Sequence, residues 1–147
     1  MKPAVLVIDM LNDFVKGSLK VEGADQAASK IAKLLAEARR RKVPVIYACD
    51  SHVPGVDREL EAWGPHALRG SWGAKIIDEL ALSDGDFVVE KRRYSAFYAT
   101  DLDLLLRELL VDTLILTGVA TEICVQHTAA DAFYRGYSIV VVEDCVK

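Results

Sequence analysis

Five short apolar runs, separated by longer stretches with helical spacing, constrain the fold of this chain most strongly. The runs are rich in β-branched residues and almost continuously apolar, which is typical of strands covered on both faces. We expect strands at residues 4–8, 43–49, 87–90, 113–117 and 138–142, and helices at 24–41, 73–80, 101–110 and 122–135. Strands that alternate with helices predict an α/β fold of three layers, α/β/α, around a parallel, Rossmann-like sheet with right-handed crossovers.

Size and composition narrow the function classes. The 147 residues fit one domain, 1–147. The formal net charge of −4 disfavours nucleic acid and anionic membranes as partners. No apolar run reaches the ~18 residues that span a bilayer, and the N-terminus has no signal-peptide layout. The 3 cysteines are widely spaced without a C-x-x-C pair, so we expect no disulfide framework and a cytoplasmic location.

Reactive side chains follow four of the predicted strands. Asp9 comes after the first strand, Asp50 and His52 after the second, Lys91 after the third, and Cys124 just beyond the fourth. In an open parallel sheet, functional groups gather beyond the carboxyl ends of the strands. We therefore expect these side chains to share one site.

Cys124 is the candidate nucleophile, since it lies near the start of a helix, where free N–H groups favour a thiolate. Asp9 would take its proton, and Lys91 would hold both anions. The N–H groups of Ala120 and Cys124 could bind an oxyanion. The alternatives are a small buried hydrophobe for Cys124, a capping carboxylate for Asp9 and a surface lysine for Lys91. His127, three residues past Cys124, is a rival base, although we expect it on the helix surface or at an interface.

The stretch from Asp50 to 72 is too long for an idle connection and holds two of the three histidines. Its oxygen and imidazole donors suit Zn²⁺, with Fe²⁺ or Mn²⁺ as alternatives, unless the loop is merely polar. The expected ligands are Asp50, His52, Glu59 and His66. Aromatic residues that could line a substrate pocket, rather than the core, are Phe14, Trp63, Tyr94 and Phe97. No G-x-G-x-x-G follows the first strand, so no dinucleotide cofactor is expected.

Three segments together resemble the isochorismatase-like cysteine hydrolases, and most of all their nicotinamidase branch. They are Val7-Ile8-Asp9-Met10-Leu11-Asn12-Asp13-Phe14, Lys91 after the third strand, and Gly118-Val119-Ala120-Thr121-Glu122-Ile123-Cys124-Val125. The resemblance implies a catalytic triad of Asp9, Lys91 and Cys124, a cis peptide before Ala120, and an oxyanion hole at Ala120 and Cys124. It also implies a metal held by Asp50, His52 and His66, with Glu59 added in some members. Strand order 3-2-1-4-5, a sixth strand and a homo-oligomer are further implications.

The chain departs from the family pattern in places. Ser51 stands where many nicotinamidases have Trp, and the Val56-Asp57 region stands where they have a further His. The family's last helix and strand are expected to be missing from a chain that ends at Lys147.

The resemblance implies a metal-assisted cysteine amidase that hydrolyses nicotinamide to nicotinate and ammonia through a thioester, a step of NAD salvage. Within the same family, hydrolysis of another amide, a carbamoyl or a ureido compound is the alternative. From a different class, Cys124 could serve a thiol redox protein, which would need Cys49 or Cys145 close by as a resolving partner.

Overall fold

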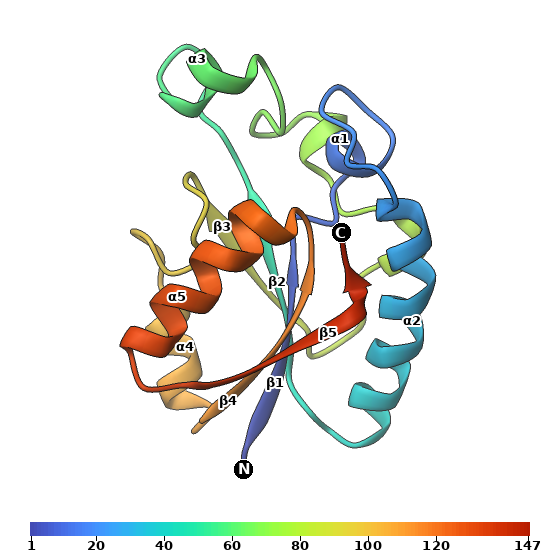
Figure 1. Cartoon of the computed structure of the whole chain (residues 1–147), viewed down its shortest axis with the longest axis vertical. Helices are drawn as coiled ribbons and strands as arrows, with labels where there is room; N and C mark the ends of the chain where they lie inside the picture. The colour runs from blue at the N-terminus through green and yellow to red at the C-terminus, as the bar shows by residue number, and fades with distance from the viewer.

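The computed structural model describes residues 1–147, and five parallel strands form its centre (Figure 1). The strands are β1 (Pro3–Ile8), β2 (Val45–Asp50), β3 (Phe87–Lys91), β4 (Thr113–Gly118) and β5 (Ser138–Val146), in the order β3-β2-β1-β4-β5. All neighbouring pairs are parallel, so the predicted sheet and its order are confirmed. β2 begins two residues later than predicted because Val43 N–H still bonds the Ala38 carbonyl at the end of the preceding helix.

Helices cover both faces of the sheet and complete the three layers. α2 (Ala24–Arg40) lies on one face, and α4 (Leu102–Glu108) and α5 (Gln126–Tyr134) lie on the other (Figure 1). The apolar stripe of α2, which includes Ile31 and Leu35, is fully buried in a core of 20 residues. Each such side chain contributes about 1.5–3 kcal/mol when it leaves water. A second core of 18 residues fills the α4 and α5 face.

The helix predicted at 73–80 is wrong. The structure has only two short 3-10 turns there, Trp72–Ala74 and Asp78–Leu80. Between them, Ile76 forms an antiparallel bridge with Leu11, which follows β1. This pairing holds the backbone extended and overrides the helical spacing of the apolar residues.

Several short elements gather beyond the carboxyl ends of the strands. The two that were not predicted, α1 (Asn12–Val15) and α3 (Glu59–Trp63), both lie at that end, at the top of Figure 1. Gly118 ends β4 with a φ of +110°, and a Cβ there would clash with the carbonyl of Ile8. Glycine therefore allows the segment after β4 to pass directly over the end of β1. No helix of the fold has the length and apolar character needed to cross a bilayer.

Candidate active site

Lys91, at the end of β3, is the centre of the site. Its buried Nζ lies 2.9 Å from Asp9 Oδ2, 2.6 Å from Asp50 Oδ1 and 3.5 Å from Cys124 Sγ. It also donates a hydrogen bond of 3.0 Å to the Arg93 carbonyl. The structure thus brings together the three residues predicted as a triad, from the ends of three different strands.

The backbone at Asp9 turns sharply at the end of β1. Its φ of +53° lies in the left-handed region, which aspartate tolerates better than most residues. Oδ1 accepts a 2.8 Å hydrogen bond from Asp50 N–H. Oδ2 accepts no hydrogen bond of good geometry, although Lys91 Nζ is 2.9 Å away. A carboxylate oxygen of Asp9 and Cys124 Sγ lie within 4.8 Å of each other, so this carboxylate can accept the thiol proton.

Burial sets the protonation states of the site. It raises the pKa of Asp9 to about 6, and the neighbouring Asp50 carboxylate adds to this effect. Burial and the Asp9 carboxylate also raise the pKa of the Cys124 thiol well above its ordinary value. Burial and the facing carboxylate therefore favour the neutral thiol, against the effect of the helix start and the Lys91 amine, which favour the predicted thiolate. Burial alone would lower the pKa of Lys91, but Asp9 and Asp50 raise it well above its ordinary value, so it remains an ammonium.

A π-helical turn, Thr121–Val125, carries Cys124, and α5 begins only at Gln126. The peptide bond between Val119 and Ala120 is cis, as the resemblance implied. Ala120 N–H donates to no backbone carbonyl, and Cys124 N–H donates to none outside its own turn. Both residues line the cavity, and the Ala120 N–H, which bonds no backbone carbonyl, is available to a ligand there.

A cavity of about 300 Å³ opens onto Asp9 and Cys124. Of the four aromatic residues predicted to line it, Phe14, Trp63 and Tyr94 do so, and Trp63 Nε1 donates a 3.0 Å hydrogen bond to Tyr94 Oη. Phe97 does not, because its ring is buried in the second core against Tyr137, with centroids 5.9 Å apart. Lining residues that sequence reasoning missed are Leu19, Lys20, Val21, Val119, Glu122 and Ile123. These lie in a loop, directly after β4 and in the π turn, whose course the sequence pattern does not reveal.

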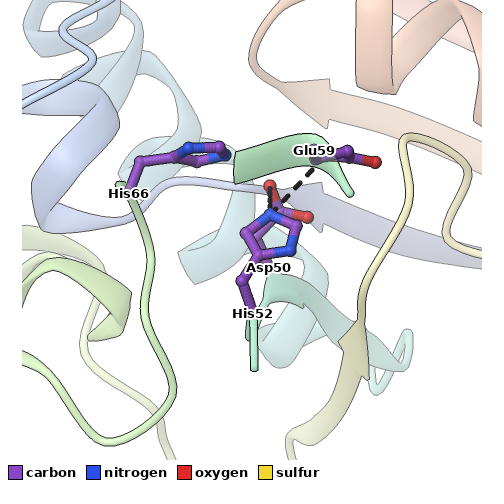
Figure 2. A group of neighbouring side chains, drawn as sticks. All are labelled: Asp50, His52, Glu59 and His66. Atoms are coloured by element: carbon purple, nitrogen blue, oxygen red, sulfur yellow. Dashed lines mark ion pairs between the residues drawn. The ribbon is translucent and has the colours of Figure 1, made fainter. Parts of the chain in front are cut away.

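The four predicted metal ligands, Asp50, His52, Glu59 and His66, form one cluster, which we call the metal group (Figure 2). Each offers one ligand atom, and these atoms lie within 4.8 Å of one another. His52 Nε2 is buried and has no hydrogen-bond partner, although it faces Asp50 Oδ2 at 3.4 Å and Glu59 Oε2 at 3.5 Å. A nitrogen lone pair between two carboxylates is unfavourable unless positive charge sits among them.

The donor set fits a divalent cation that accepts both imidazole and oxygen. His66 Nδ1 bonds the Gly64 carbonyl at 2.8 Å, which leaves its Nε2 as the free donor. Although burial opposes it, Asp50 raises the pKa of His52. Burial and Asp50 also raise the pKa of Glu59 to about 7. The Asp50 carboxylate thus favours the protonated forms of both His52 and Glu59.

Sequence reasoning did not give a role to Asp57 or Arg92. Asp57 Oδ2 lies 3.0 Å from His52 Nδ1, and its Oδ1 accepts a hydrogen bond of 2.8 Å from Arg92 Nε. Hydrogen bonds from Arg92 hold the pKa of Asp57 well below its usual range. The only sequence signal was the Val56-Asp57 departure from the family pattern, which pointed to the place but not to the contact.

Other candidates lie away from the triad. His127 is exposed on α5, and its Nδ1 bonds the Ile123 carbonyl at 2.7 Å, so it is not the base for Cys124. Cys49 and Cys145 are free and belong to the core on the α2 face, whereas Cys124 belongs to the core on the α5 face. The structure therefore places no resolving thiol beside Cys124, as a redox role would require.

Comparisons with known proteins agree with this fold. A family model described as the isochorismatase domain matches residues 3–147. The structure is similar to that of an N-carbamoylsarcosine amidase from Thermoplasma acidophilum, with 47% identity, a TM-score of 0.96, and coverage of 99% of this chain and 84% of that one. It is also similar to a nicotinamidase from Bacillus subtilis (36% identity, TM-score 0.93, coverage 99% and 86%). A third similar structure is a pyrazinamidase from Pyrococcus horikoshii in complex with zinc (27% identity, TM-score 0.93, coverage 100% and 87%).

Proposed function

We propose that this chain, which belongs to the isochorismatase family of hydrolases, is a metal-assisted cysteine amidase that hydrolyses nicotinamide to nicotinate and ammonia. One observation carries the proposal. A single buried ammonium, that of Lys91, contacts a carboxylate of Asp9 and the thiol of Cys124 beside a cavity of about 300 Å³. A base, a nucleophile and a fixed positive charge in contact are the components of amide hydrolysis through a covalent intermediate.

The reaction begins with the transfer of the Cys124 proton to Asp9 as sulfur attacks the carboxamide carbon. With a pKa of about 6, Asp9 is ionised at neutral pH and still basic enough to accept this proton. The N–H groups of Ala120 and Cys124 stabilise the oxyanion. Asp9 then returns the proton to the leaving nitrogen, and ammonia departs from a thioester. Water, deprotonated by Asp9, hydrolyses the thioester, so that the acid is released and the thiol restored.

In the proposed reaction, the metal group and the aromatic side chains of the cavity orient the substrate. A divalent cation held by Asp50, His52, Glu59 and His66 would bind the pyridine nitrogen and so orient the amide. Phe14, Trp63 and Tyr94 offer faces and edges to a planar ring. Similarity to the Bacillus nicotinamidase supports this substrate.

An N-carbamoyl amino acid is the second candidate substrate. The higher identity to the N-carbamoylsarcosine amidase, 47%, favours it. Lys20 also favours it, because this lysine lines the cavity and makes no ion pair within the chain. Its ammonium could meet a carboxylate that nicotinamide does not have.

Ammonia release from nicotinamide and from N-carbamoylsarcosine tests the proposal and separates the two substrates. With protein loaded with Zn²⁺ or Mn²⁺, we expect kcat/KM to be higher for nicotinamide by at least about tenfold. Lys20→Met should leave the nicotinamide reaction unchanged. Turnover of the carbamoyl compound alone, sensitive to Lys20→Met, would establish the second candidate. No ammonia from either compound would exclude both candidate substrates and overturn the proposed function.

Removal of one metal ligand should act mainly on substrate binding. In His66→Ala, we expect KM for nicotinamide to rise by at least about tenfold, since a loss of only ~1.4 kcal/mol of binding gives that factor. kcat should change less, because Asp9, Lys91 and Cys124 remain in place. Steady-state kinetics with the metal supplied at saturation measure both. His127→Ala is the control, because His127 packs beside Tyr94 but does not itself line the cavity, and it should change KM much less than His66→Ala does. A fall in kcat alone for His66→Ala would contradict the positioning role.

A further inference from the structure

The two histidines of the metal group are held by different acceptors. His66 Nδ1 bonds a backbone carbonyl, that of Gly64, at 2.8 Å. His52 Nδ1 instead lies 3.0 Å from a carboxylate oxygen, Asp57 Oδ2. A carboxylate that accepts the Nδ1 proton fixes the ring and its tautomer, and makes the opposite nitrogen a better metal donor. His52 Nε2 is the atom that the protein leaves buried without a partner, so its orientation matters most.

Asp57 is itself immobilised on every side. Its side chain is fully buried, and Oδ2 also accepts a 3.1 Å hydrogen bond from Val53 N–H. Arg92 Nε donates to Oδ1 at 2.8 Å, and Arg92 Nη2 donates to the same oxygen. A carboxylate with both oxygens held in this way cannot rotate away from His52. Burying the Asp57 carboxylate with fewer partners would lower the stability of the fold. Its contacts are therefore consistent with a role in holding the His52 ring in place.

Arg92 connects this arrangement to the triad. It directly follows Lys91 at the end of β3; Lys91 is buried against Asp9, whereas the Arg92 side chain is 48% exposed and reaches Asp57. The same strand end therefore places the amine of the triad and the residue that clamps Asp57. A shift of that strand end would move both sites together.

We propose that Asp57, clamped by Arg92, is the positioning residue that orients His52 and sets the affinity of the metal group for a divalent cation. This inference rests on the metal-assisted function proposed above. Asp57 supplies no ligand atom to the metal group, so it acts through His52 and not directly on the cation. Asp57→Asn keeps the shape of the side chain but removes the charge that strengthens the hydrogen bond from His52.

The test measures Zn²⁺ affinity directly, by competition with a chromophoric chelator on the metal-free protein. We expect Asp57→Asn to weaken Zn²⁺ binding by about 10- to 100-fold. Arg92→Gln should weaken it by a smaller factor, because it leaves two of the hydrogen bonds to Asp57 in place. Because Arg92 is half-exposed, this variant also tests the proposal if Asp57→Asn does not fold.

Asp86→Asn is the matched control. The side chain of Asp86 is only 4% exposed, and it pairs with an arginine (Arg39 Nη2, 2.6 Å). It also accepts a hydrogen bond from a backbone N–H, that of Ser83, at 2.9 Å. The Asp86→Asn protein should lose about as much stability as Asp57→Asn but keep the Zn²⁺ affinity of the wild type. Wild-type affinity in folded Asp57→Asn, or an equal loss in Asp86→Asn, would overturn the proposal.

Histidine NMR gives a second readout that a merely structural role would not move. With only 3 histidines, the ¹⁵N signals of His52 can be assigned by its substitution. In the metal-free protein, at a pH high enough for His52 to carry a single proton, the wild type should hold that proton on Nδ1, and Asp57→Asn should show a mixture of tautomers. A wild type that binds no Zn²⁺ would overturn this proposal and the metal in the proposed function together. Absence of amidase turnover, by contrast, would not affect the affinities or the tautomers.

Discussion

Cys124→Ala should release no measurable ammonia from nicotinamide or from any other amide, while the protein remains folded and still binds the substrate. The thiol is the only nucleophile beside Asp9 and Lys91. Removal of a nucleophile from a coupled catalytic set lowers kcat by roughly 10⁴-fold or more. The cavity and the metal group do not depend on the sulfur atom, so KM or a directly measured Kd should change little.

Single-turnover ammonia assays at high protein concentration, together with substrate binding by calorimetry, measure these two properties separately. Cys49→Ala is the matched control, because it makes the same change at a buried cysteine in the opposite core. It should retain most of the activity. Turnover that persists in Cys124→Ala would exclude covalent catalysis by this residue, whereas loss of both activity and binding would point to a structural role for the sulfur.

The fold was predictable because its strands are marked by apolar runs, which reflect burial on both faces in β1 and β2 although the edge strand β5 is largely exposed. Continuous apolar runs identified all five strands, and the spacing of Ile31 and Leu35 identified α2. The segment 73–80 shows why local patterns fail. Its apolar residues have helical spacing, yet Ile76 pairs with Leu11, more than sixty positions earlier in the chain. A pattern read over a short stretch of sequence cannot reveal a contact between residues so far apart in the chain.

The convergence of the site was predictable from one topological rule, since the residues that follow parallel strands meet at one edge of the sheet. Asp9, Lys91 and Cys124 come together for that reason. Their protonation was not predictable, because it depends on how completely the folded chain excludes water from Cys124. The contact between Asp57 and His52 was also out of reach, because it depends on the course of a loop that has no periodic pattern.

The second large effect is expected for Lys91→Met, which removes the charge between two buried carboxylates. Asp9 and Asp50 would then face each other without compensation, at a cost of about 3–5 kcal/mol in the free energy of unfolding. The pKa of Asp9 would rise further, so that Asp9 would be protonated at neutral pH and unable to accept the thiol proton. Loss of fixed positive charge at such a site lowers kcat by about 10²- to 10³-fold.

Lys16→Met is the matched control, because Lys16 Nζ also lies 2.9 Å from a carboxylate, that of Glu79, but on the exposed surface. Its loss should change the free energy of unfolding little, because exposed ion pairs are screened by solvent, and should leave turnover unchanged. Chemical denaturation and steady-state kinetics measure both effects.

The pH dependence of stability separates a missing charge from a simple packing defect in Lys91→Met. A carboxyl whose folded-state pKa is raised above its unfolded value binds more protons in the folded state, so its contribution to stability is greatest at low pH and is lost as pH rises through the folded-state pKa. In the wild type this applies to Asp9 up to about pH 6. In Lys91→Met the pKa of Asp9 is higher still, so the pH range over which this contribution is lost extends upward. Between pH 8 and pH 5, acidification should therefore raise the free energy of unfolding by up to about 1.4 kcal/mol per pH unit. A deficit that stays constant over that range would mean that the loss comes from packing, and that Lys91 does not hold the charges of Asp9 and Asp50 in balance.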